Sequence, residues 1–113
     1  MIGRRILVVE DNDQVQDLLV TALRAEGAEV LRAFNIGEAL QAEGPFDLLV
    51  LDLRLPNGDG REIARHYAGT PAVYVTGYGQ DLGKFGPLDP EDVVPKPFTI
   101  RDLLTVARRK LNR

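Results

Sequence analysis

Short apolar runs alternate along the chain with segments in which apolar side chains recur every three or four positions. The runs have the length of buried strands, and the segments have the period of amphipathic helices. One run, Leu48–Leu51, is apolar at every position, which is typical of a central parallel strand covered by helices on both faces. The repeated alternation predicts an α/β fold with a doubly wound parallel sheet. The expected strands are 6–9, 30–33, 48–51, 72–75 and 93–94.

Capping residues indicate where the helices between these strands begin and end. Asp13 and Gln16 have the spacing of a capping box at the start of the first helix, and Gly27 is placed to end that helix. The other helices are expected at 36–40, capped by Asn35, around 63–67, and at 100–111, capped by Thr99 with Asp102.

A fourth helix would fall in a segment rich in helix breakers. Residues 77–90 contain Gly77, Gly79, Gly83, Gly86, Pro87 and Pro90. Each glycine costs a helix roughly 1 kcal/mol, and an interior proline roughly 3 kcal/mol, relative to alanine. We therefore expect the fourth helix to be atypical, shortened or loop-like, and the segment 77–92 to be mobile.

Composition narrows the classes of function. The 113 residues suit one domain, expected to span 1–113. Lys and Arg number 14 against 17 Asp and Glu, so no general basic field is available for nucleic acid or an anionic membrane surface. The absence of cysteine and the single histidine exclude disulfides, zinc clusters and iron–sulfur centres. No signal-peptide core or membrane span is evident, so we expect a cytoplasmic protein.

Polar residues stand at the carboxyl ends of four of the expected strands. They are Glu10 and Asp11, Asp52, Thr76 with Gly77, and Lys96. In an open parallel sheet this edge holds the ligand crevice. Carboxylates gathered in one crevice repel each other unless a cation joins them, and Mg²⁺ prefers such oxygen ligands. The Thr76 hydroxyl and the Lys96 ammonium suit a phosphoryl group near Asp52.

Four motifs, taken in their order along the chain, resemble those of the CheY-like receiver domain of two-component response regulators. They are Val8–Asn12, Leu49–Gly60, Val75–Gly77 and Val94–Phe98. The resemblance implies a flavodoxin-like sheet of order 2-1-3-4-5 and a cis Lys96–Pro97 peptide bond. It implies that Asp52 is the phosphoacceptor, that Thr76 and Lys96 contact the phosphoryl group, and that Mg²⁺ is bound by Glu10, Asp11, Asp52 and the Arg54 backbone carbonyl.

The chain departs from the family pattern at one switch position. The family usually has an aromatic residue three positions before the lysine, and this chain has Val93 there. The segment Pro71–Gly79 is similar to the signature of the FAT GUY response regulators, which singles out Tyr78, beside Gly77, as the residue that reports phosphorylation.

The leading hypothesis is a signalling module and not a turnover enzyme. Its expected partners are a histidine kinase or histidine phosphotransfer protein and an unidentified downstream protein. One alternative is a receiver-like binding module that acts without phosphorylation. Another is an aspartate-nucleophile phosphatase, but those enzymes need an acid where this chain has Arg54. The length favours a free-standing regulator, while a domain excised from a longer protein stays open.

Overall fold

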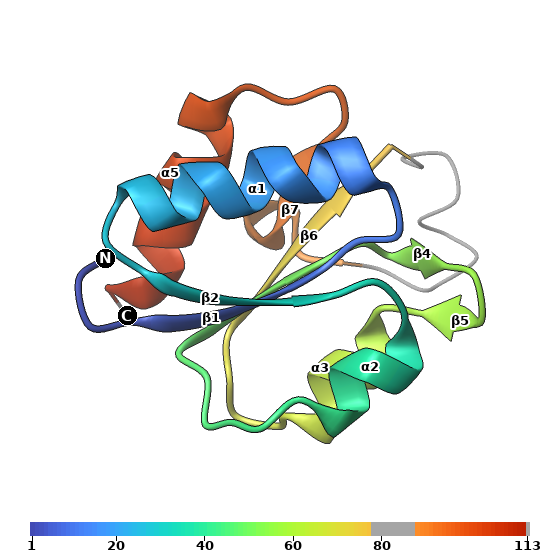
Figure 1. Cartoon of the computed structure of the whole chain (residues 1–113). Helices are drawn as coiled ribbons and strands as arrows, with labels where there is room; N and C mark the ends of the chain where they lie inside the picture. Colours follow the sequence, from blue (N-terminus) through green and yellow to red (C-terminus); the bar gives the residue numbers. More distant parts are fainter. Residues whose placement is uncertain (78–87, 113) are drawn as a thin grey trace.

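The computed structural model describes residues 1–77 and 88–112. Five parallel strands form one sheet in the order β2-β1-β3-β6-β7 (Figure 1). Counting only these strands, the order is 2-1-3-4-5, so the fold-class prediction is confirmed. The strands are β1 Arg5–Val9, β2 Glu29–Ala33, β3 Leu48–Leu51, β6 Ala72–Thr76 and β7 Val93–Pro95.

The helices form a layer on each side of the sheet. In Figure 1, α1 and α5 lie on one side, and α2 and α3 lie on the other. Their bounds are α1 Asp13–Ala25, α2 Ile36–Gln41, α3 Arg61–His66 and α5 Ile100–Leu111, and a 3₁₀ turn, η2, spans Pro90–Asp92. The predictions of a loop-like fourth helix and of mobility fall largely on residues 78–87, which lie outside the described residues.

Alternating side chains of the central strands fill two separate cores. In β1, Ile6 and Val8 belong to the cluster packed with α1 and α5, whereas Leu7 and Val9 belong to the cluster packed with α2 and α3. All four are fully buried. Because both faces of the sheet are apolar, the polar residues that follow the strands are left at its carboxyl edge.

The start of α1 differs from the predicted capping box. Asn12, and not Asp13, is the N-cap, because Asn12 has extended backbone angles and its Oδ1 accepts a hydrogen bond from Val15 N at 2.9 Å. The Gln16 side chain is instead buried, and its amide nitrogen donates to the Glu10 and Ala33 carbonyl oxygens. Gly27, at φ 91°, lies just beyond the helix end, as predicted.

The predicted caps of α2 and α5 are confirmed, whereas α3 begins at Arg61, two residues before the predicted position. The Asn35 side chain caps α2, and Thr99 and Asp102 form a capping box on α5. The glycine-rich turn after β3 contains two short antiparallel strands, β4 Arg54–Leu55 and β5 Gly58–Asp59.

Candidate functional site

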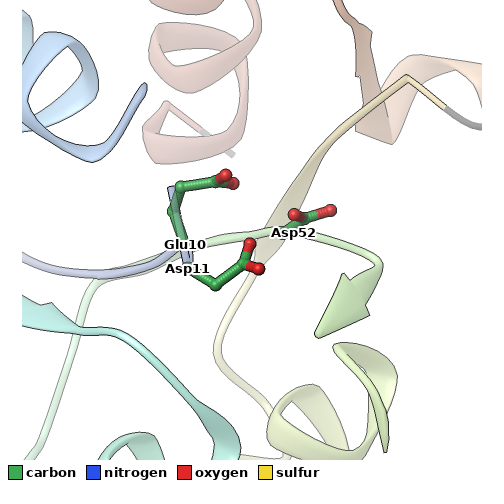
Figure 2. A group of neighbouring side chains, drawn as sticks. All are labelled: Glu10, Asp11 and Asp52. Atoms are coloured by element: carbon green, nitrogen blue, oxygen red, sulfur yellow. The ribbon is translucent and has the colours of Figure 1, made fainter. Parts of the chain in front are cut away.

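Three carboxylates meet at the carboxyl edge of the sheet (Figure 2). Glu10 and Asp11 follow β1, and Asp52 follows β3, the neighbouring strand. Each offers an oxygen, and these oxygens lie within 4.8 Å of one another. Glu10 and Asp52 are 1% and 4% exposed, whereas Asp11 is exposed. The sequence prediction that separate segments bring these acids together is confirmed.

The three acids line a cleft of about 520 Å³. The other residues around it are Asn12, Val15, Arg54, Gly77 and Lys96. A reactant therefore reaches the two buried carboxylates through an open, polar cleft.

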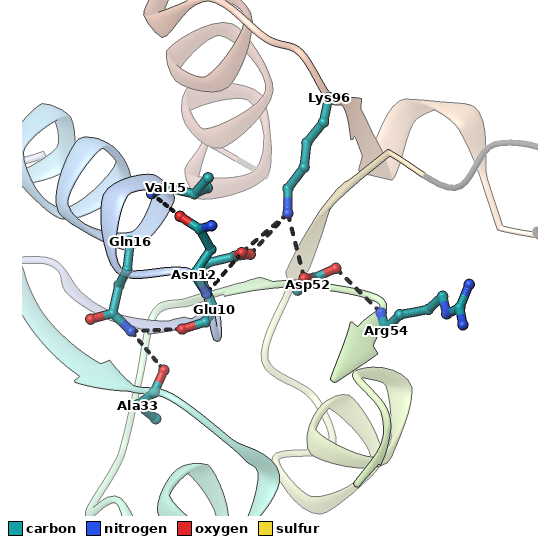
Figure 3. Close-up of polar contacts among 8 residues, drawn as sticks. All are labelled: Glu10, Asn12, Val15, Gln16, Ala33, Asp52, Arg54 and Lys96. Atoms are coloured by element: carbon teal, nitrogen blue, oxygen red, sulfur yellow. Dashed lines mark hydrogen bonds and ion pairs between the residues drawn. The ribbon is translucent and has the colours of Figure 1, made fainter. Parts of the chain in front are cut away.

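Lys96 joins the two buried carboxylates (Figure 3). Its Nζ lies 3.2 and 3.1 Å from the two Glu10 carboxylate oxygens and 3.4 Å from Asp52 Oδ2. The lysine follows β7, and its peptide bond to Pro97 is cis, as predicted. Asp52 is held from its other side, because its Oδ1 accepts a hydrogen bond from Arg54 N at 3.3 Å.

Burial dominates the electrostatics of this cluster. It raises the pKa of Glu10 to about 7, and the Asp52 charge adds to that rise while Lys96 opposes it. Burial also raises the pKa of Asp52, against the opposing effect of Lys96. For Lys96, burial lowers the pKa, but the two carboxylates outweigh it and leave the pKa raised. Three carboxylates against one ammonium leave an excess of negative charge suited to a divalent cation with oxygen ligands.

The raised pKa of Glu10 predicts how stability depends on pH in the absence of metal. Between pH 4.5, the usual value for a glutamate, and about 7, Glu10 binds a proton in the folded chain and releases it in the unfolded chain. The contribution of Glu10 to the free energy of unfolding is therefore full below pH 4.5. We expect it to fall by up to about 3 kcal/mol as the pH rises through 7.

Chelator-treated protein unfolded in urea from pH 4.5 to 8 measures this effect against Glu10→Gln. The amide does not titrate, so the variant is expected to be the more stable protein at pH 8, with the difference disappearing near pH 4.5. Parallel pH profiles for the two proteins would contradict the prediction.

Gly60 has a role at the site that the sequence did not reveal. A Cβ at this position would lie 2.1 Å from the Asp52 carbonyl oxygen and 3.1 Å from the Asp52 carbonyl carbon. Gly60 N also donates a 2.8 Å hydrogen bond to Leu53 O. The turn after β3 therefore folds back directly on the backbone of Asp52, and only glycine permits that approach.

Gly60→Ala is expected to lower the free energy of unfolding by about 1–3 kcal/mol, because the Asp52 backbone must shift to admit the methyl group. Urea unfolding measures the loss. Gly37→Ala in α2 is the matched control, because among the described residues outside its own helix the added methyl comes nearest to Asn35 Oδ1, at 3.4 Å. Equal effects of the two substitutions would show that the close approach at Asp52 is unimportant.

Three further residues from the sequence analysis are either absent from the described lining of the cleft or outside the described residues. Thr76 is buried at the end of β6 and is not among the described residues that line the cleft. Its backbone oxygen accepts a 2.8 Å hydrogen bond from Lys96 N, which fixes the strand carrying the lysine. Val93 is half-buried in β7 and lines a different groove, against α5. Tyr78 lies outside the described residues.

Comparison with protein families agrees with this geometry. The model of the response regulator receiver domain matches residues 6–108. The chain belongs to this family. It is a phosphoacceptor receiver domain of a two-component system and not a turnover enzyme, and its Glu10–Asp11–Asp52 triad is typical of a Mg²⁺ site.

Similar proteins include regulators and isolated receiver domains. The KDP operon transcriptional regulatory protein KdpE of Escherichia coli (strain K12) is 33% identical over 115 residues, covering 96% of this chain and 51% of KdpE. The non-phosphorylated HemR receiver domain from Leptospira biflexa is 29% identical, with a TM-score of 0.80, covering 98% of this chain and 96% of that one.

The response regulator TrrA from Thermotoga maritima, in complex with Mg²⁺ and BeF, is 29% identical to the receiver domain, with a TM-score of 0.82. The similarity covers 96% of this chain and 99% of that one. The receiver domain spans about half the length of the curated relatives it matches. No helix among residues 1–77 and 88–112 has the length and hydropathy needed to cross a bilayer.

Proposed function

We propose that Asp52 is the phosphoacceptor and that the chain signals through the changed contacts of its phosphorylated form. The observation that carries this proposal is the convergence of Glu10, Asp11, Asp52 and Lys96 on one open cleft. A structural ion pair would need one carboxylate for its lysine, whereas this cluster holds three.

The same residues fit a magnesium ion. Glu10, Asp11 and Asp52 would hold it with carboxylate oxygens, and the Arg54 backbone carbonyl would complete the protein's share of the ligands. Bound there, Mg²⁺ would neutralise charge on the phosphoryl oxygens. The exposed Asp11 leaves one side of the triad open to solvent and to a phosphoryl group.

Lys96 and the backbone around Asp52 prepare the carboxylate for attack. Lys96 lowers the pKa of Asp52 against the effect of burial, and so favours the ionised form that reacts. An Asp52 oxygen attacks the phosphorus in line, so that a new O–P bond forms as the N–P bond of a donor phosphohistidine breaks. The leaving imidazole nitrogen takes up a proton. Lys96 and Thr76 then contact the transferred group.

The donor in this proposal is a histidine kinase or a histidine phosphotransfer protein, and the receiver unit is residues 1–113. Helix α1 and the loop at Pro97 and Phe98 are the expected donor contact, and the segment 77–92 with α5 is the expected output face. The downstream protein, the lack of nucleic-acid or membrane binding and the cytoplasmic location stay predictions from the sequence.

A finer assignment within the family rests mainly on the segment Pro71–Gly79. We propose that it places the chain near the FAT GUY regulators, with Tyr78 in place of the usual aromatic residue at Val93. The small, half-buried Val93 side chain supports this proposal, because it offers no ring that could change its orientation on phosphorylation.

The test of the proposed function is chemical phosphorylation. The protein is incubated with acetyl phosphate and Mg²⁺, its intact mass is measured, and the modified residue is located by peptide mapping. We expect one phosphoryl group on Asp52 and none when a chelator replaces Mg²⁺. No adduct, with partner binding unchanged, would favour the binding module that acts without phosphorylation, and steady release of phosphate would favour a phosphatase.

A further inference from the structure

One polar side chain close to the site is completely buried. Gln16 lies on α1 with no exposed surface, on the helix face that also carries Leu19, Val20 and Leu23. Its neighbours on that face are apolar residues of the core. A buried amide needs hydrogen-bond partners, and those of Gln16 lie at the ends of two strands.

The amide nitrogen of Gln16 holds the backbone from which the metal-binding acids project (Figure 3). Nε2 donates to Glu10 O at 3.1 Å and to Ala33 O at 2.8 Å. Glu10 N donates to the same Ala33 oxygen at 3.1 Å. The Glu10 backbone is thus tied on its N–H side to β2 and on its carbonyl side to α1.

Further hydrogen bonds connect Gln16 with the loop that carries Asp11. Gln16 N donates to Asn12 O at 2.9 Å, and Asn12 N donates to Glu10 Oε1 at 3.4 Å. Gln16 therefore holds the segment 10–12 through both its side chain and its backbone. Asp11, the exposed acid, lies between Glu10 and Asn12, which these hydrogen bonds hold in place.

Core packing alone does not explain a glutamine at this position. Gln16 Oε1 is buried and has no hydrogen-bond partner within the part of the chain that the structure describes. Exchanging the oxygen and nitrogen of the amide would set an oxygen against two carbonyl oxygens, so the orientation is fixed. A methionine would fill similar space without an unpaired oxygen, but it would leave the Glu10 carbonyl without this donor.

We propose that Gln16 is a positioning residue for the magnesium site, which it serves by fixing the Glu10 peptide and, through it, the orientation of Glu10 and Asp11. The inference rests on the proposed function, because it assumes that these acids bind the metal. Groups that orient metal ligands without touching the metal typically change its affinity when they are removed.

The experiment titrates Mg²⁺ into wild-type protein and Gln16→Met by isothermal calorimetry. We expect the variant to bind Mg²⁺ about 10-fold more weakly. In phosphorylation by acetyl phosphate, the Mg²⁺ concentration for half-maximal rate is expected to rise by a similar factor. The rate at saturating Mg²⁺ is expected to stay close to that of wild type, because Gln16 does not touch the phosphoryl group.

Leu23→Val is the matched control, since Leu23 is buried on the same helix two turns farther from the site. It is expected to lower the melting temperature without changing Mg²⁺ affinity. Wild-type Mg²⁺ affinity in Gln16→Met, an equal loss of affinity in Leu23→Val, or a Gln16→Met protein that does not fold would each overturn the inference. A wild-type protein that binds no Mg²⁺ would instead overturn the proposed function.

Discussion

Asp52→Asn is expected to abolish the phosphoryl adduct without lowering stability. An amide nitrogen or oxygen cannot replace the attacking carboxylate oxygen, so no adduct forms at any Mg²⁺ concentration. The folded protein, however, loses a buried charge whose pKa burial raises. Lys96 keeps both of its contacts with Glu10. At pH 8 without metal, the free energy of unfolding is therefore expected to equal or exceed that of wild type.

Intact mass after acetyl phosphate treatment and urea unfolding at pH 8 measure the two effects. Asp59→Asn is the control, because Asp59 lies in the same turn region but pairs with Arg61, with Asp59 Oδ2 2.9 Å from Arg61 Nη2. That variant is expected to keep the adduct. An adduct retained by Asp52→Asn would assign the phosphoacceptor role to another residue, and a clear loss of stability would show that the Asp52 charge is well compensated in the fold.

The sequence was sufficient to predict the sheet and the residues at its carboxyl edge. The period of the apolar residues distinguishes strands from helices, and parallel strands place Glu10, Asp11 and Asp52 at one edge whatever the details of packing. The N-caps of α2 and α5, Asn35 and Thr99, were predictable because the local sequence allows only one capping interpretation at each.

The errors and omissions come from contacts that depend on tertiary structure. Asp13–Gln16 has the spacing of a capping box, but Gln16 also continues the buried stripe of Leu19 and Val20, and burial determined its role. That stripe was the available signal, since a polar residue in it must find partners in the core. Nothing in the sequence shows that Gly60 lies against the Asp52 carbonyl, because this contact depends on how the turn folds back.

The bridging position of Lys96 was also beyond the sequence. A lysine at a strand end was predicted to meet a phosphoryl group, and the structure shows how it pairs with Glu10 and Asp52 in the absence of one. The ammonium thus offsets part of the charge that a metal would neutralise. Because Lys96 contacts both carboxylates, we expect a large effect on stability when this lysine is replaced.

Lys96→Met is expected to lower the free energy of unfolding by on the order of 2 kcal/mol at pH 8 without metal. Removing one member of a buried ion pair typically costs about 3–5 kcal/mol, and the Lys96 side chain is 24% exposed, which reduces the loss. The pKa values of Glu10 and Asp52 are expected to rise further, because Lys96 lowers both. Phosphorylation by acetyl phosphate is expected to slow by roughly 100-fold, as when one charge-stabilising donor is lost from a reaction site.

Saturating Mg²⁺ distinguishes this loss of stability from ordinary damage to the fold. A cation held by Glu10 and Asp52 supplies charge that Lys96 no longer supplies, so Mg²⁺ is expected to stabilise Lys96→Met more than wild type and to narrow the difference between them. Lys110→Met is the matched control, because Lys110 forms a largely buried ion pair with Asp92, which lies away from the cleft. Its deficit in urea unfolding is expected to be the same with and without Mg²⁺. If Mg²⁺ narrowed both differences equally, or neither, Lys96 and the metal would not share the same carboxylates.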